Sequence, residues 1–140
     1  MYVCSYNGSD HLCMFQGNQL QGYARGHGVI LDTNYQIVQT VGTGKDLTAA
    51  DQHEFRLVDG GKTALITVFQ QVPYDLSKIN ITSQGWVMDG IFQAINISTG
   101  AVEFEWSALN HVAPWGTYVY PEKSDISGDV RTSQTAWDYL

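Results

Sequence analysis

The sequence predicts an all-β fold, about half of a β-propeller built from four-stranded antiparallel blades. Residues that suit pleated strands are plentiful, because the chain contains 8 Tyr, 5 Phe and 4 Trp. Its 14 Gly interrupt the sequence at short intervals, and the apolar residues show no amphipathic helical period of any length. Short apolar segments separated by turn residues are typical of sandwiches, barrels and propellers.

The strands are expected between turn residues, taken in chain order. The first pair flanks Asn7-Gly8-Ser9-Asp10, and the second flanks Asp32-Thr33-Asn34. The third flanks Asp59-Gly60-Gly61-Lys62, and a later pair flanks Ser98-Thr99-Gly100. The expected strands are Tyr2–Tyr6, His11–Gln16, Gly28–Asp32, Gln36–Val41, His53–Val58, Ala64–Phe69, Trp86–Met88, Phe92–Ile97, Val102–Trp106 and Thr117–Tyr120.

The length of the chain sets the expected extent of the fold. A propeller has 4–8 blades of about 40–45 residues each, so 140 residues supply roughly three. We therefore expect one incomplete domain over residues 1–140 that ends before the ring closes. Its open edges would favour self-association. The alternative is a complete β-sandwich, which needs only about 100 residues.

The composition restricts the partners. A net charge of −7, from 14 acidic and 7 basic residues, disfavours nucleic acids and anionic membranes as partners. An anionic substrate would require a local positive site. No apolar run reaches the roughly 20 residues that span a bilayer, and the N-terminus lacks a basic segment followed by a long apolar stretch. These residues alone leave the localisation undefined.

The two cysteines fall in the first expected hairpin. If Tyr2–Tyr6 pairs with His11–Gln16 so that partner numbers sum to 17, Cys4 faces Cys13 directly. Directly opposed Cβ atoms lie about 4.5–5.5 Å apart, somewhat wide for a disulfide until the pair tightens. A disulfide and two buried free thiols both remain open at this stage.

An ordered series of short motifs carries a family resemblance. The matching strings are Gly26-His27-Gly28-Val29-Ile30-Leu31-Asp32, Asp51-Gln52-His53-Glu54-Phe55, Thr63-Ala64-Leu65-Ile66-Thr67, Tyr74-Asp75-Leu76-Ser77, Gly85-Trp86-Val87-Met88-Asp89, Phe92-Gln93-Ala94-Ile95-Asn96-Ile97-Ser98-Thr99-Gly100, Val102-Glu103-Phe104-Glu105-Trp106-Ser107, His111-Val112 and Trp137-Asp138-Tyr139. In order and spacing the chain resembles the fungal arylsulfotransferase-like family, which is related to bacterial arylsulfate sulfotransferases.

The resemblance implies a six-bladed propeller with its active site at the central channel. The implied reaction moves a sulfuryl group from a phenolic sulfate to a phenol, through a histidine nucleophile and without a cofactor. The family also implies a secreted or extracellular protein. Ala94, Asn96 and Asn110 depart from the family pattern, and the implied nucleophile and a sulfate-binding Arg have no counterpart before Leu140. This chain alone is therefore expected to be inactive, and the alternative function is a non-catalytic propeller module for binding or structure.

Histidines are the candidate site residues, because imidazole can act as nucleophile or exchange protons near neutral pH. His53 is the first candidate: the resemblance places it at the family's first active-site histidine, in a binding or acid–base role. We expect it to open a strand and to share a face with Phe55. His27, between two glycines, and His111, in a loop, are further candidates, and Arg25 is a candidate for binding sulfate oxygens.

Other motifs predict modification rather than catalysis. Asn7-Gly8-Ser9, Asn80-Ile81-Thr82 and Asn96-Ile97-Ser98 fit the N-glycosylation pattern and suit a secreted protein. Asn96 falls within an expected strand, which disfavours its modification. Asp51 and His53 are two residues apart, but no further ligand follows at zinc-like spacing, so no metal site is expected.

Overall fold

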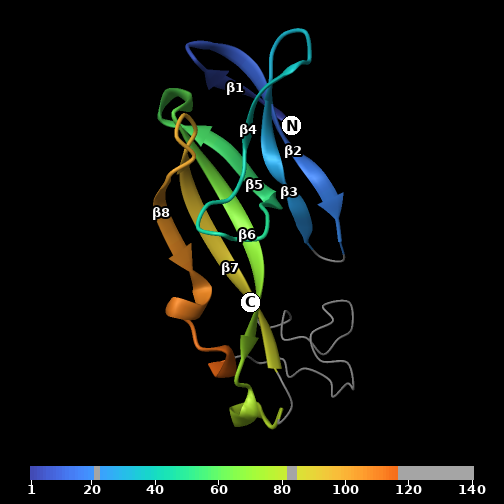
Figure 1. Cartoon of the computed structure of the whole chain (residues 1–140), viewed down its shortest axis with the longest axis vertical. Helices are drawn as coiled ribbons and strands as arrows, with labels where there is room; N and C mark the ends of the chain where they lie inside the picture. The colour runs from blue at the N-terminus through green and yellow to red at the C-terminus, as the bar shows by residue number, and fades with distance from the viewer. Residues whose placement is uncertain (21–22, 82–84, 117–140) are drawn as a thin grey trace. The chain divides into compact units, whose positions relative to one another are not determined.

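The computed structural model describes residues 1–20, 23–81 and 85–116, and all structural statements concern these residues. Strands β1 (Tyr2–Tyr6), β2 (Ser9–Gln19), β3 (Ala24–Leu31) and β4 (Ile37–Val41) form one four-stranded sheet in that order, here called sheet 1. Strands β5 (Asp51–Val58), β6 (Thr63–Tyr74), β7 (Gly85–Asn96) and β8 (Val102–Ser107) form sheet 2 (Figure 1). Both sheets are antiparallel.

The all-β prediction is confirmed, and each sheet is a meander of four strands, as in a propeller blade. The described residues form two such sheets and no closed ring. Outside the strands lie the short 3₁₀ turns η1 (Asp59–Gly61), η2 (Ser77–Ile79), η3 (Ala108–Asn110) and η4 (Pro114–Gly116). None of the described helical segments has the length and apolar character needed to cross a membrane. The expected strand Thr117–Tyr120 lies outside the described residues.

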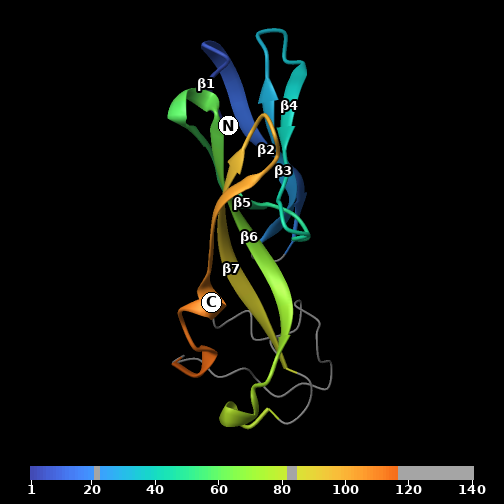
Figure 2. The same ribbon diagram turned by 60° about the vertical axis from the view of Figure 1, so that its left-hand side comes forward.

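The chain divides into two compact units. Unit 1 comprises Met1–Val68 and Phe92–Trp106, and unit 2 comprises Phe69–Ile91 and Ser107–Leu140. The long strands β6 and β7 run on from one unit into the other (Figure 2). Sheet 1 therefore belongs wholly to unit 1, together with β5, β8 as far as Trp106, and the adjoining ends of β6 and β7.

The core of unit 1 is formed by apolar side chains from both sheets. Ile30 of sheet 1 and Ile66 of sheet 2 are fully buried, and Phe55 and Ile95 join them. Burying each such side chain contributes about 1.5–3 kcal/mol. Gly28 permits the close approach, because a Cβ atom there would overlap the ring of Phe55. Sheet 1 and the unit 1 part of sheet 2 are thus packed as neighbouring layers.

The predicted register of the first hairpin is wrong by two residues. Tyr2 pairs with Cys13, and Cys4 pairs with His11, so the two cysteines are diagonal neighbours on one face. Their Cα atoms are 5.8 Å apart, and a disulfide joins them. The tight turn explains the correction: Asn7 and Gly8 both adopt positive φ (51° and 77°), which brings Tyr6 directly opposite Ser9.

Two expected boundaries are wrong for identifiable reasons. Trp86–Met88 and Phe92–Ile97 belong to one strand, β7, which continues through Gly90. A glycine inside a strand need not break it, and here Phe69 lies 3.9 Å from the position of a Gly90 Cβ. Asp32 lies outside β3 because its carboxylate caps the turn, accepting from the Asn34 and Gln36 amides at 2.8 and 2.9 Å.

The connection between β4 and β5 is anchored by buried Gln93. Its Oε1 accepts from the Gly44 amide at 3.1 Å, and its Nε2 donates to the Gly44 carbonyl at 3.2 Å and to Glu105 Oε2 at 2.6 Å. Lys45 pairs with the other oxygen of Glu105 at 3.1 Å. The Gln93 hydrogen bond, with a smaller contribution from Lys45, lowers the pKa of Glu105.

Unit 2 has a small core of its own. Leu76 and Val87 are fully buried there, with Val72 and Tyr74 packed against them. Buried Asp89 accepts from the Ser107 hydroxyl at 2.6 Å and from the Leu109 amide at 3.1 Å. This carboxylate therefore fixes the chain where it leaves β8.

Candidate functional site

The candidate site begins at a bulge in β5. Asp51 pairs with Thr67, but the next pairing is Phe55 with Ile66, so the intervening residues are excess on the β5 side. Such a bulge breaks the alternation of faces and redirects side chains. The expected shared face of His53 and Phe55 is therefore wrong: Phe55 is buried, whereas the His53 side chain is 56% exposed. His53 also does not open the strand, which begins two residues earlier at Asp51.

Asp51 contacts both the backbone and the ring of His53. Its side chain is completely buried, and Oδ1 accepts from the Ala24 amide of β3 at 2.6 Å. Oδ2 accepts from the backbone amide of His53 at 3.0 Å and also contacts Nδ1 of the His53 ring. Aspartate commonly bonds to a backbone amide two residues ahead, and this local turn produces the bulge. A buried carboxylate and an exposed imidazole are thereby joined.

The start of β3 lies beside this segment. Gly26 and Ala50 exchange two backbone hydrogen bonds, of 2.9 and 3.0 Å, in an isolated antiparallel bridge. This pairing continues the edge of β3 beyond the end of β4, whose last partner is Gly28. It brings the backbone around Arg25 and His27 next to the backbone that leads to His53.

Arg25 and His27 alternate with Gly26 along β3, on the opposite face of the strand. Both are half-buried, and they stand opposite Asn18 and Gln16 of β2. The Arg25 guanidinium lies 5.9 Å from the ring centre of Tyr23. Among the described residues, its Nε is buried without a hydrogen-bond partner.

The remaining predicted site residues lie elsewhere. His111 belongs to unit 2, is exposed, and contacts the Ser107 carbonyl through Nδ1 at 2.9 Å. Asn7 and Asn80 are exposed turn residues with positive φ. Asn96 ends β7, and its amide donates to Glu103 at 2.9 Å.

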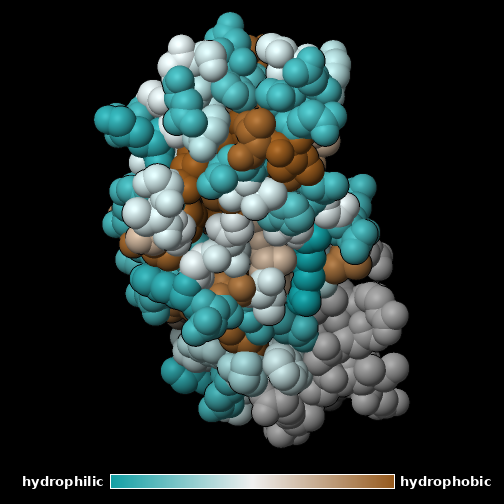
Figure 3. Space-filling view, turned by 45° about the horizontal axis from the view of Figure 1, so that its top comes forward, coloured by the Kyte–Doolittle hydropathy of each residue, from teal (hydrophilic) through white to brown (hydrophobic). Residues whose placement is uncertain are grey.

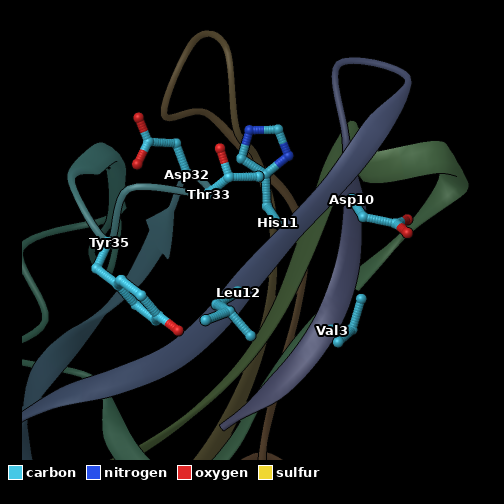
Figure 4. A pocket seen from close by; sticks show the side chains of 7 residues that line it. All are labelled: Val3, Asp10, His11, Leu12, Asp32, Thr33 and Tyr35. Carbon is cyan, nitrogen blue, oxygen red and sulfur yellow. The ribbon is translucent and has the colours of Figure 1, made fainter.

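A surface cavity lies at the hairpin-turn end of sheet 1. It has a volume of about 310 Å³ and is lined by Tyr35 and Leu12, which point toward one another, and by His11 and Asp32 (Figure 4). Hydrophobic side chains interrupt the polar surface seen from this end of the molecule (Figure 3). The Asp32 carboxylate is engaged by the turn amides described above. The residues that line the cavity do not include His53 or its neighbours in β5.

Comparison with known proteins supplies the family. The model of the family described as Arylsulfotransferase (ASST) matches residues 4–140. The chain belongs to the arylsulfotransferase family. No curated protein and no solved structure gives a significant match.

The arylsulfotransferase match covers every histidine of the chain but assigns none of them a role. The resemblance marks His53 as a candidate, but nothing in the sequence analysis predicts that the Asp51 carboxylate contacts its ring. In the described part of the chain, no group of three or more His, Cys, Asp or Glu side chains gathers as metal ligands do. The missed signal was the Asp-x-His spacing at a strand start, where a carboxylate can bond back to the residue two positions ahead.

Proposed function

We propose that this chain serves the transfer of a sulfuryl group from a phenolic sulfate to a phenol, with His53 as the proton carrier. The observation that carries the proposal is the bridge between Gly26 and Ala50, which brings the segments of a cation, Arg25, and an exposed imidazole, His53, together in unit 1. Membership in the arylsulfotransferase family supports the reaction class. The wider setting is a six-bladed propeller, of which the two described sheets would be neighbouring blades.

The proposed chemistry balances with two proton transfers, one to His53 and one from it. The S–O bond of the aryl sulfate breaks as the sulfuryl group passes to the histidine nucleophile that the resemblance implies, and the resulting S–N bond breaks as an S–O bond to the acceptor phenol forms. The acceptor hydroxyl loses its proton to the His53 ring, and the departing phenolate oxygen receives a proton from that ring, so His53 is unchanged over the cycle. No cofactor enters this balance.

Charge at the sulfate is the second requirement. Arg25 is proposed to contact the sulfate oxygens, because its charge is permanent and its donors are forked. His27, two residues along the same strand, is proposed as an additional donor to the substrate. The chain has a net charge of −7, which repels anions, so an anionic substrate requires a local cation such as Arg25.

We expect the polypeptide of residues 1–140 alone not to transfer a sulfuryl group, because none of its residues matches the nucleophile that the resemblance implies. The test uses the folded chain with 4-nitrophenyl sulfate and a phenol acceptor. We expect no acceptor-dependent release of 4-nitrophenol above a His53→Ala control. Acceptor-dependent release by the unsubstituted chain would show that the essential chemistry lies within these residues.

The role of His53 is tested in a longer polypeptide that extends these residues to a closed propeller. There His53→Ala should lower turnover by about 10²–10⁴, the range for an acid–base residue, whereas the control His11→Ala should leave it unchanged. Equal turnover of His53→Ala and wild type rejects the assignment. A folded protein that never releases the phenol favours the alternative, a non-catalytic binding or structural module.

Self-association is proposed through the open edges of the sheets. Strands β1 and β4 are the edge strands of sheet 1, and they carry exposed Val3, Ile37 and Val38. Unpaired edges with exposed apolar residues favour pairing with another chain. Sedimentation of residues 1–140 should show species above the monomer mass, and Ile37→Lys should reduce them. A concentration-independent monomer contradicts this proposal.

Secretion and glycosylation are proposed together. Asn7 and Asn80 are exposed and in turns, so both are accessible to a glycan, whereas the Asn96 amide is engaged by Glu103. Produced through a eukaryotic secretory pathway, the protein should carry glycans at Asn7 and Asn80. Peptide mass spectrometry after deglycosylation reads each site, and unmodified Asn7 and Asn80 would contradict the proposal.

A further inference from the structure

The contacts of Asp51 exceed what a structural anchor requires. Its buried carboxylate has two oxygens with different tasks. Oδ1 accepts from the Ala24 amide of β3, which joins β5 to sheet 1. Oδ2 accepts a hydrogen bond from the backbone amide of His53 and also contacts Nδ1 of its ring. An ionised carboxylate is acceptor-only, so a neutral His53 ring must donate to it from Nδ1.

We propose that Asp51 is a positioning residue that keeps a proton on Nδ1 of His53 and makes Nε2 the nitrogen that exchanges protons with the substrate. The two ring nitrogens of histidine are distinguished by the hydrogen bond that one of them makes. Here the carboxylate makes that bond and also fixes the ring plane relative to β5. The reaction in which Nε2 takes part rests on the proposed function.

Geometry separates this role from simple anchoring. The bond to the Ala24 amide needs one acceptor atom, which the amide oxygen of Asn would also supply. Asn cannot, however, present acceptor oxygens on both sides. If its oxygen faces Ala24, its NH₂ group faces both the backbone amide and the ring of His53, so the bond from that backbone amide is lost, and the ring must accept at Nδ1 and carry its proton on Nε2. Asp51→Asn should therefore keep the strands joined but reverse the tautomer.

The tautomer can be measured without any catalytic assay. Two-bond ¹H–¹⁵N spectra of the 140-residue protein, labelled with ¹⁵N at histidine, show which ring nitrogen of His53 is protonated. They are recorded at a pH that leaves the ring neutral. Wild type should carry the proton on Nδ1, and Asp51→Asn should show it on Nε2 or divided between both. The matched control is Asp89→Asn, since buried Asp89 binds Ser107 and Leu109 in unit 2.

The outcomes separate clearly. A wild-type ring protonated on Nε2 overturns the proposal, and so does an Asp51→Asn ring that keeps the wild-type tautomer while the Ala24 amide proton stays protected from exchange. If Asp51→Asn does not fold, the wild-type spectrum alone decides, because the two tautomers give opposite patterns. A change of tautomer in Asp89→Asn would also overturn it, since the effect would then not be specific to the carboxylate beside His53.

The link to the reaction has a separate readout. In a polypeptide that turns over aryl sulfate, Asp51→Asn should lower kcat by about 10–10⁴-fold with little change in KM, because the ring is misprotonated while the sulfate contacts persist. Unchanged kcat would remove Asp51 from the reaction. If His53→Ala is also fully active, the proposed function fails, and the spectra still report independently on the tautomer.

Discussion

Replacing Gln93 by Leu removes the polar contacts of a fully buried side chain at nearly constant volume. Gln93 makes two hydrogen bonds with the Gly44 backbone and one with the Glu105 carboxylate. A neutral hydrogen bond contributes about 0.5–1.5 kcal/mol net, and one to a charged group about 1.5–3 kcal/mol. The three together therefore amount to roughly 2.5–6 kcal/mol on those values.

Access of water to the partners of Gln93 makes the expected loss of stability smaller than this sum. Gly44 and Glu105 are only half-buried, so solvent can replace part of what they lose, and the polar groups are not left wholly unsatisfied. We expect Gln93→Leu to reduce the free energy of unfolding by about 2–4 kcal/mol. Because Leu is close in volume to Gln, a cavity contributes little to this loss.

Urea unfolding, followed by tryptophan fluorescence, measures the effect. With an m value of about 2 kcal/mol/M, the midpoint of Gln93→Leu should fall by about 1–2 M. The control is Gln16→Leu, because Gln16 is exposed on β2, and its midpoint should not change. If Gln93→Leu unfolds at the wild-type midpoint, the buried polar contacts do not anchor the β4–β5 connection, and the reasoning is refuted.

Three further outcomes follow from the described contacts. The Gln93 hydrogen bond is the main cause of the lowered pKa of Glu105, so the stabilisation that this carboxylate gives is present above its unfolded pKa and fades as pH falls through its folded pKa. Glu105→Gln should therefore cost stability near neutrality, and its urea midpoint should converge with that of wild type only below the lowered pKa. Gly28→Val should cost about 1–3 kcal/mol by overlap with Phe55, whereas Gly42→Val, where no atom lies within 4 Å, should not; equal urea midpoints would contradict this. Reducing the disulfide should cost about 2–3 kcal/mol, read as a midpoint shift with added reductant, and no shift would contradict its stabilising role.

Sequence reasoning was most reliable where local chemistry alone decides. The sequence predicts a strand at Tyr2–Tyr6, as observed for β1, because the run Asn7-Gly8-Ser9-Asp10 that follows consists of turn residues. The register of that hairpin was wrong, since it depends on how many residues the turn takes up, and positive φ at Asn7 and Gly8 shortened it. The residue types thus predict that the strand exists. The register of its pairing depends on the turn dihedrals, which the residue types do not determine.

The candidate site shows the same division. The resemblance pointed to His53, but strand alternation gave the wrong face, because the bulge before Phe55 interrupts the period. The partnership of Asp51 with Ala24 was beyond sequence reasoning, since those residues are brought together only by the bridge of Gly26 with Ala50. Long-range pairing between backbones carries no local sequence signal.

The connection between the sheets is fixed at two points, at Gly44 by Gln93 and at Ala50 by Gly26. Only the chain between those points can change in length without moving the start of β5. Insertions there would form an outward loop and leave the backbone entering the His53 segment in place, whereas a single added residue after Ala50 would shift Asp51 out of register. A tag or a fluorescent label is therefore best introduced at exposed Asp46, where chain length and site geometry are uncoupled.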